Sequence, residues 1–210
     1  RTYEADRASL EACGCDLLFM PGHETVYPFG IEHSIRIAAP ADIASRLEGK
    51  SRPGHFDGVL TVVARLFNLV SPDVAVFGEK DYQQLLLIRR MVDDLSYAIR
   101  IVPVATVREH SGLAMSSRNT YLEGAQKDAA AHLNLVLSEV AEQVRHHPAA
   151  WQQAESDAVS KLEKLGFRVD YVAVRDAGSL ARPSAETDEL RVLVAAKCGQ
   201  TRLIDNMKII

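Results

Sequence analysis

The sequence has few cysteines and no long apolar run. Its 210 residues include only Cys13, Cys15 and Cys198, and such an odd, sparse set does not build a disulfide framework. The histidines do not cluster near Cys13 and Cys15 at zinc-ligand spacing, so no metal site is indicated. No apolar stretch is long enough to cross a bilayer, and no secretory signal opens the chain. We therefore expect reduced thiols in a cytoplasmic protein without a membrane partner.

The sequence also lacks an excess of positive charge. It contains 24 lysines and arginines against 28 aspartates and glutamates, a formal net charge of −4. This balance gives no support to a nucleic-acid-binding surface as the main function, so we expect no nucleic-acid partner. With 47% hydrophobic and 25% charged residues, the composition is that of an ordinary globular protein. The length suits one large or two small domains.

Several common catalytic motifs are absent as well. No segment fits the P-loop, the G-x-G-x-x-G dinucleotide fingerprint, the G-x-S-x-G nucleophile elbow or the H-E-x-x-H zinc motif. The chain begins with Arg1 rather than methionine, and we expect it to be part of a longer protein.

The stretch 77–84, Phe-Gly-Glu-Lys-Asp-Tyr-Gln-Gln, is the most informative part of the chain. It follows a short apolar run at 74–76 and precedes apolar positions at helical spacing over 85–95. This pattern predicts a strand-to-helix turn, and in α/β sheets such turns lie where ligands bind. Gly78 lets the backbone approach a ligand, and Lys80 supplies a mobile positive charge. A purely structural role has about equal weight, because Asp81 and Gln84 have the spacing of a capping box.

Hydrophobic periodicity and breaker residues predict the remaining elements. We expect helices over residues 2–13, 41–47, 55–70, 123–146 and 149–165, strands over 16–20, 34–38, 99–107, 167–174, 190–196 and 202–205, and loops over 23–30 and 49–54. Alternating strands and helices in the first half indicate a parallel sheet with crossover helices, and the second half has an α+β pattern. We place a domain boundary near Val107, which gives domains 1–107 and 108–210.

Three polar loops lie on this apolar scaffold. The first, residues 50–55, brings two basic side chains and a histidine to the start of a helix, where free N–H groups favour anions. The second is the turn at 78–81. The third, residues 112–119, offers two serine hydroxyls and an arginine, a suitable set for phosphate oxygens. Each loop taken alone is explained at least as well as a solvated turn or helix cap. Together they favour a site for a phosphate-bearing ligand.

Four motifs of the chain resemble those of the pantothenate synthetases, the pantoate–β-alanine ligases. They are R-P-G-H-F at 52–56, F-G-E-K-D-Y-Q-Q-L at 77–85, G-L-A-M-S-S-R-N at 112–119 and R-L-I-D-N at 202–206. Any one of them could arise by chance. All four occur in the family's order and at family-like spacing, and the resemblance covers nearly the whole chain.

The resemblance implies an α/β fold in which a Rossmann-like parallel sheet, with its N-terminal part missing here, is followed by a smaller α+β domain that closes over it. It implies an ATP-dependent ligase that joins pantoate to the α-phosphate of ATP, releasing pyrophosphate. The pantoyl group then passes to β-alanine and AMP is released. Mg²⁺ would be carried on the ATP phosphates, which suits a chain without a protein metal cage. The family is usually homodimeric.

The same resemblance implies roles for individual residues. Lys80 and Arg118 would be catalytic at the phosphates, Gln84 would hydrogen-bond pantoate, and Arg52 and His55 would lie near the substrates. The ATP site would comprise Gly78, Glu79, Lys80, Asp81, Val107, Met115, Ser116, Ser117 and Arg118. Such a set suits acyl adenylation, which needs charge neutralisation and positioning more than a protein nucleophile.

Two positions depart from the family pattern. The H-x-G-H turn that supplies the family's acid histidine is not among these residues, so we expect the 210 residues alone to be inactive. Ser111 stands where the family usually has an acidic residue, which bears on loop mobility. The alternatives are a non-catalytic nucleotide-binding or dimerising fragment and another nucleotidyltransferase of the same superfamily. An H-x-G-H turn encoded upstream would favour the ligase over the fragment.

Overall fold

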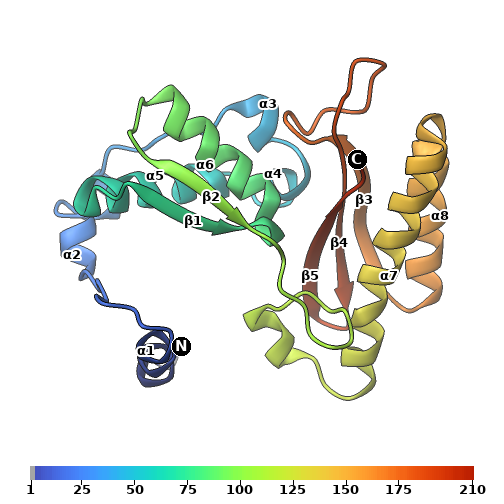
Figure 1. The fold of residues 1–210 in the computed structure, drawn as a ribbon, viewed down its shortest axis with the longest axis horizontal. Coiled ribbons are helices and arrows are strands. Elements are labelled where there is room, and N and C mark those ends of the chain that lie inside the picture. Colours follow the sequence, from blue (N-terminus) through green and yellow to red (C-terminus); the bar gives the residue numbers. More distant parts are fainter. Residues whose placement is uncertain (1–2) are drawn as a thin grey trace.

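The computed structural model describes residues 3–210 and contains two sheets flanked by helices (Figure 1). Its elements are α1 (Tyr3–Ala12), α2 (His23–Val26), η1 (Ile31–His33), α3 (Ala41–Ala44), α4 (Leu47–Ser51), α5 (His55–Val70), β1 (Val74–Gly78), η2 (Glu79–Asp81), α6 (Tyr82–Asp94), β2 (Arg100–Val104), η3 (Ser117–Tyr121), α7 (Ala125–His146), η4 (Pro148–Ala150), α8 (Trp151–Lys164), β3 (Arg168–Asp176), β4 (Leu190–Cys198) and β5 (Thr201–Lys208). The predicted α/β class is confirmed.

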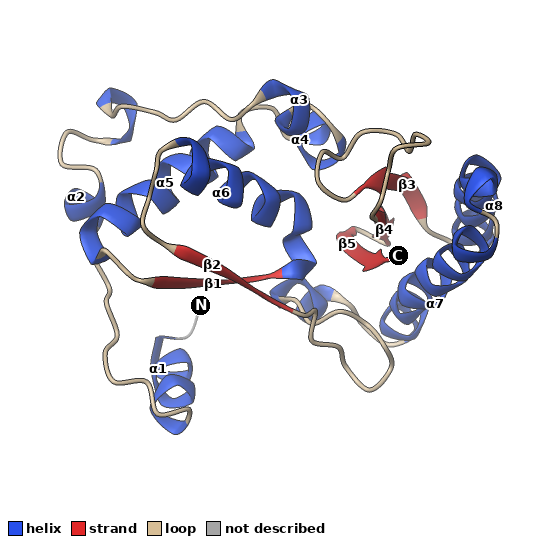
Figure 2. Ribbon diagram, turned by 45° about the horizontal axis from the view of Figure 1, so that its top comes forward, coloured by secondary structure: helices blue, strands red, loops and turns tan. Residues whose placement is uncertain are grey.

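The first sheet consists of β1 and β2, which pair in parallel with Val74 opposite Arg100. Helix α6 forms the crossover between them, as the alternating pattern predicts. Helices α5 and α6 cover one face of this sheet (Figure 2). There Phe77 packs against the hydrophobic cluster that the buried side chains of α5 and α6 form. On the other face, Val76 and Val104 are 61% and 42% exposed. Parallel strands are usually covered on both faces, so this bare face is unusual.

The second sheet has the order β3-β4-β5 and is antiparallel throughout. Helices α7 and α8 pack against one face and build the larger hydrophobic cluster, with Leu162 and Val174 fully buried. The opposite face meets the N-terminal part of the molecule, where Leu193 of β4 joins the cluster of α5 and α6. Strand β4 is therefore buried on both faces. Polar side chains on the face that meets the N-terminal part lie at the boundary between the two parts of the chain.

Helix α5 shows how local sequence sets its own ends. Gly54 precedes it at φ +74°, a left-handed conformation that glycine adopts without strain. Ser71 follows it at φ +49°, and Pro72 cannot continue the helix. The predicted bounds of this helix are therefore confirmed at both ends. They place His55 on its first turn, beside the first polar loop.

Several local predictions are wrong. Residues 16–20 and 34–38 form no strand in the described part of the chain, because no neighbouring segment pairs with them, and Leu17 is 76% exposed. The predicted loops at 23–30 and 49–54 contain the short helix α2 and the end of α4. The helix predicted from residue 2 is α1, although residue 2 itself lies outside the described residues. No helix within residues 3–210 is long and apolar enough to span a membrane.

Candidate active site

A cavity of about 290 Å³ lies where the two parts of the chain meet. The polar loops supply its cations and amides: Arg52 and His55 come from the α4–α5 segment, Lys80 and Gln84 from η2 and α6, and Arg118 from η3. The strands β3, β4 and β5 supply the opposite wall through Tyr171, Leu193, Ile204, Asp205 and Asn206. The loops that the sequence separates thus open onto one space.

The η2 turn is fixed by the C-terminal sheet. The Nδ2 group of Asn206 donates hydrogen bonds to the backbone oxygens of Glu79 and Lys80 at 2.9 and 2.8 Å. The Lys80 side chain is 16% exposed, with its Nζ 3.9 Å from a carboxylate oxygen of Asp81. Asp81 makes no capping hydrogen bond to α6, so the capping box at Asp81 and Gln84 is not formed. The η2 turn is held by Asn206 of β5 instead, which leaves the side chains of Asp81 and Gln84 available at the cavity.

Arg191 of β4 also supports the η2 turn, through contacts with Glu79 and Tyr82. Its guanidinium lies over the Tyr82 ring, 3.8 Å from the centroid, and 3.6 Å from the carboxylate of Glu79. The Tyr82 hydroxyl donates to the backbone oxygen of Ala177 at 2.9 Å. A guanidinium over an aromatic face is a favourable cation–π contact. These contacts connect the first turn of α6 to the C-terminal part of the chain.

The two neighbouring glutamines of α6 have different surroundings. Gln83 is buried, accepts a hydrogen bond from the backbone N–H of Glu48 at 3.1 Å, and donates to the backbone oxygens of Ile43 and Arg46. It therefore fixes the end of α3 and the start of α4. Gln84 is half-buried and lines the cavity.

His55 contacts its neighbour Arg52. Its Nε2 lies 2.9 Å from Nη1 of Arg52, and because arginine only donates, Nε2 is the acceptor. Partial burial and the positive charge of Arg52 lower the pKa of His55. The cavity therefore receives one permanent positive charge from this pair, and His55 orients the guanidinium that carries it.

The third loop is anchored at its base. Arg108 donates to both carboxylate oxygens of Asp205, at 2.7 and 3.1 Å, and to the backbone oxygen of Gly112 at 3.1 Å. Asn119 donates to Glu109 at 2.8 Å and to the Ala114 backbone oxygen at 3.0 Å. Arg118 lies between these anchors and lines the cavity. Its side chain makes no ion pair with any residue in the described part of the chain, so its charge is available to an anion.

The other predicted ATP-site residues are not among those that line the cavity. Ser116 lines a small adjoining pocket that Lys80 and Arg118 share. Val107 and Met115 are 60% and 56% exposed, and the Met115 N–H donates to the Val107 backbone oxygen at 2.9 Å. Gly78, Glu79 and Ser117 flank the lining residues in sequence. Their roles stay predictions.

Sequence reasoning missed Glu48 and Tyr171, which line the cavity. Arg202 donates to both carboxylate oxygens of Glu48 at 2.7 and 2.8 Å, and the Tyr171 hydroxyl donates to Glu48 at 2.8 Å. Burial alone would raise the pKa of Glu48, but the bonds from Arg202 and Tyr171 outweigh it and lower that pKa. No local motif marks Glu48, because its partners lie on strands far along the chain.

Replacing Tyr171 with phenylalanine is expected to lower the free energy of unfolding by about 1–2 kcal/mol, because a carboxylate loses a hydrogen-bond donor. Urea unfolding at pH 7 measures the effect. The matched control is Tyr121→Phe, since Tyr121 is 73% exposed and its hydroxyl change should be neutral. Equal stability of the two variants would contradict a stabilising role for the Tyr171 hydroxyl.

The carboxylates that line the cavity are the groups that could contribute to a metal site. Within residues 3–210, no group of three or more histidine, cysteine, aspartate or glutamate side chains is placed to bind a metal. Glu48 and Asp205 line the cavity but are paired with Arg202 and Arg108. Besides the single carboxylate of Asp81, the available charged groups are the cations of Arg52, Lys80 and Arg118, which suit phosphate or carboxylate oxygens.

Comparisons with known proteins agree on one family. The family profile described as "Pantoate-beta-alanine ligase" matches residues 1–208. The pantothenate synthetase of Shewanella halifaxensis (strain HAW-EB4) is 49% identical over 209 residues, which is 100% of this chain and 73% of that protein. The pantothenate synthetase of Shewanella amazonensis is 51% identical over 207 residues, with 99% and 73% covered.

Solved structures give the same result. The crystal structure of pantothenate synthetase from Thermus thermophilus superposes with a TM-score of 0.91 at 43% identity, covering 100% of this chain and 75% of that one. A pantoate–β-alanine ligase from Francisella tularensis, described as complexed with β-γ ATP and β-alanine, gives a TM-score of 0.79 at 32% identity. There, 100% of this chain and 70% of the other are covered.

Proposed function

This chain belongs to the pantoate–β-alanine ligase family, and from that premise we propose that its cavity takes part in joining pantoate to β-alanine through a pantoyl adenylate. One observation carries the proposal. Lys80 and Arg118, from separate loops, line the same 290 Å³ cavity as Arg52 and Gln84. Three cations and an amide around one space suit a substrate pair consisting of a nucleotide triphosphate and a hydroxy acid.

In the first step, a carboxylate oxygen of pantoate attacks the α-phosphorus of ATP, and the bond to the bridging oxygen breaks as pyrophosphate leaves. Negative charge gathers on the phosphate oxygens during this exchange. We assign its stabilisation to Lys80 and Arg118, because donors already in place act most strongly where charge develops. In the second step the β-alanine nitrogen attacks the acyl carbon, AMP leaves with the electron pair of the broken bond, and the nitrogen loses a proton.

We assign the pantoate side of the cavity to Gln84, Arg52 and His55. The half-buried Gln84 amide offers donors and an acceptor to the hydroxyl groups of the substrate. Arg52 offers a guanidinium to its carboxylate, and the Arg52–His55 contact limits the motion of that guanidinium. Positioning of this kind favours an in-line attack without a protein nucleophile.

We assign the adenine and phosphate side to the second and third loops. The Met115 N–H donates to the Val107 backbone oxygen at 2.9 Å, and this bond connects Val107 to the third loop. The proposed ATP contacts are Gly78, Glu79, Asp81, Val107, Met115, Ser116 and Ser117. Mg²⁺ would bind to the ATP phosphates rather than to a protein cage.

We further propose that the protein works as a cytoplasmic homodimer. The support is the family's usual assembly and three cysteines that are all free thiols, as a reducing compartment allows.

Activity is tested by AMP release from ATP, pantoate and β-alanine. We expect turnover from a chain extended at its N-terminus with the corresponding segment of the Shewanella halifaxensis relative, and none from the 210 residues alone, which contain no H-x-G-H turn. Adenylation of a different carboxylate by the extended chain would favour another nucleotidyltransferase. ATP binding without any adenylation would favour a binding module.

A further inference from the structure

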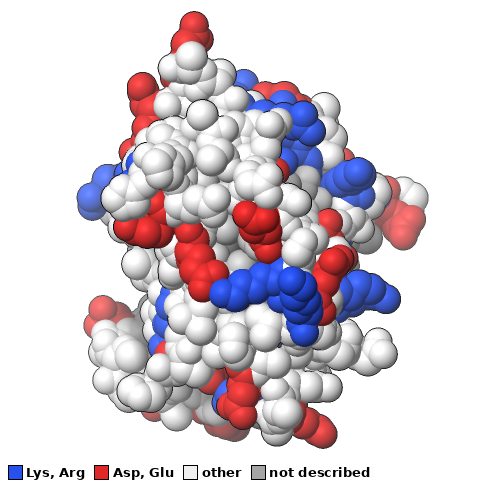
Figure 3. Space-filling view, turned by 90° about the vertical axis from the view of Figure 1, so that its right-hand side faces the viewer, with Lys and Arg blue, Asp and Glu red and all other residues white. Residues whose placement is uncertain are grey.

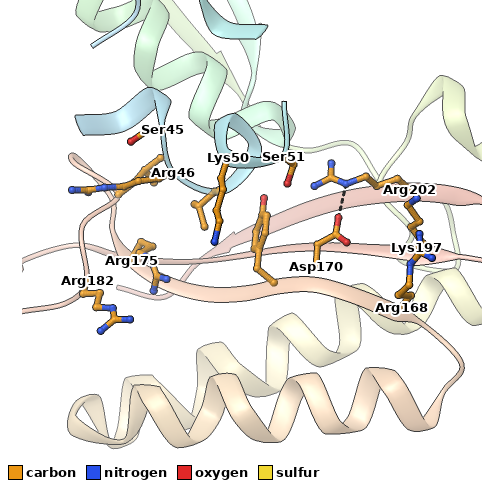
Figure 4. Close-up of a pocket in the computed structure, with 13 residues that line it drawn as sticks. Ser45, Arg46, Lys50, Ser51, Arg168, Asp170, Arg175, Arg182, Lys197 and Arg202 are labelled. Carbon is orange, nitrogen blue, oxygen red and sulfur yellow. Dashed lines mark hydrogen bonds and ion pairs between the residues drawn. The ribbon is translucent and has the colours of Figure 1, made fainter. Parts of the chain in front are cut away.

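A second and larger cavity, of about 970 Å³, lies beyond Tyr171, which borders both cavities. It is formed by residues 45–51, which follow α3 and include α4, on one side, and by the C-terminal sheet with the loop after β3 on the other (Figure 4). Its ionisable lining is almost entirely basic, since Asp170 is the only carboxylate among the lining residues. Lys50 and Ser51 come from the first polar loop and Arg202 from the R-L-I-D-N motif, but the other basic residues that line this basic pocket belong to none of the motifs discussed above.

Three cations of the basic pocket lie side by side on neighbouring strands. Arg168 on β3 is paired in register with Lys197 on β4, and Lys197 with Arg202 on β5. Like charges directly opposite one another destabilise a sheet. Arg202 is neutralised by Glu48 and Asp170. Arg168 and Lys197 make no ion pair with any residue between 3 and 210. This cationic row is therefore a feature that the fold alone does not favour.

The opposite end of the basic pocket carries further cations. Figure 4 shows Arg46, Arg175 and Arg182 at this end, Lys197 and Arg168 at the other, and Lys50 between them. Arg46 and Arg175 are held by the Ser179 backbone oxygen at 3.0 Å and by Glu155 at 2.8 Å. Within the described residues, neither Lys50 nor Arg182 has a side-chain partner. Each end of the basic pocket thus combines guanidinium groups held by a hydrogen bond or an ion pair with cations that have no ion-pair partner among the described residues.

This concentration of charge contrasts with the rest of the molecule. The net charge of the chain is −4, and on the face that includes α7 and α8 basic side chains alternate with carboxylates (Figure 3). A concave surface lined by one sign of charge raises the local concentration of the opposite ion. Arginine forks fit phosphate oxygens in pairs, and lysine adds a point charge.

We propose that the basic pocket is a binding site for a small anion carrying two or more phosphoryl groups, distinct from the candidate active site. The two groups of cations would each hold one anionic end, with Lys50 between them. Binding would relieve the repulsion along the row formed by Arg168, Lys197 and Arg202. The proposal rests on this geometry and stands whether or not the ligase mechanism above is correct.

The test uses inorganic tripolyphosphate as the probe and isothermal titration calorimetry as the readout. The background is the 210-residue chain carrying Lys80→Ala and Arg118→Ala, which removes the phosphate-facing cations of the candidate active site. In this background we expect one binding event. Adding Arg182→Gln and Lys197→Gln should weaken it about thirtyfold, because two close charges are lost. The matched control adds Arg100→Gln and Lys164→Gln, one arginine and one lysine that are exposed and away from the pocket.

Folding is checked by thermal unfolding without the probe. The Lys197→Gln change removes a like-charge contact, so the melting temperature should not fall. No binding in the background protein, or equal weakening by the two double substitutions, would overturn the proposal. Loss of binding upon Lys80→Ala and Arg118→Ala alone would place the anion in the candidate active site instead.

Discussion

Replacing Lys80 with alanine in the N-terminally extended protein is expected to slow adenylation about 10²–10³-fold. The structure allows the effect of the Lys80 side chain to be separated from the shape of the η2 turn. The backbone of Lys80 is held by Asn206 through main-chain oxygens, so the turn keeps its shape when the side chain is removed. Under the proposed mechanism, the lost group is a charge at the phosphates rather than a support of the fold.

The same substitution should change the dissociation constant of pantoate by less than about threefold, because a group that acts mainly in the transition state contributes little to ground-state binding. Single-turnover pyrophosphate release measures the adenylation rate, and calorimetry measures pantoate binding. Lys164→Ala, at the exposed end of α8, is the control and should leave both unchanged. Parallel losses in rate and binding would instead show that Lys80 is a substrate-binding residue.

Replacing Arg202 with leucine is expected to lower the free energy of unfolding by about 2–4 kcal/mol at pH 7. Arg202 is bonded to Glu48 and to Asp170 at distances of 2.7–2.8 Å. Its loss leaves the Glu48 carboxylate, which is only 12% exposed, without a counter-charge. The effect is smaller than for a fully buried pair because Arg202 and Asp170 are 21% and 30% exposed.

The pH dependence gives this prediction a second readout. The pKa of Glu48 is lowered from 4.5 in the folded protein. A lowered folded-state pKa stabilises the protein above the unfolded-state value, and that stabilisation disappears as the pH falls through the folded-state pKa. The stability difference between the native protein and Arg202→Leu should therefore be full near neutrality and shrink below about pH 4.5. Urea unfolding across this range measures it. A difference that does not vary with pH would show that lost packing, not charge, is the cause.

The elements that sequence reasoning predicted well are those whose ends are chemically marked. Gly54 and Ser71-Pro72 bound α5, and Pro148 separates α7 from α8. Residues 16–20 show the opposite case, since their apolar side chains suit a strand but a strand also needs a partner. Local composition contains no information on whether that partner is present.

The candidate site divides in the same way. The loops carrying Lys80 and Arg118 could be selected from their residues, and the structure brings these two side chains to one cavity. Glu48 and Tyr171 could not, because each acquires its role from a hydrogen bond to a distant part of the chain. Asn206 lies within a recognised motif, yet its task of holding the η2 turn is visible only in the folded chain.

The β1–β2 sheet has open edges in addition to its bare face, and these edges affect how the polypeptide behaves in solution. Within residues 3–210 each of these strands has a neighbour on one side only, so the outer edge of each offers main-chain donors and acceptors beside exposed valines. An open edge of this kind is a template for another extended chain. At the protein concentrations used for crystallisation, we therefore expect the isolated polypeptide to self-associate by edge-to-edge pairing of β1 or β2.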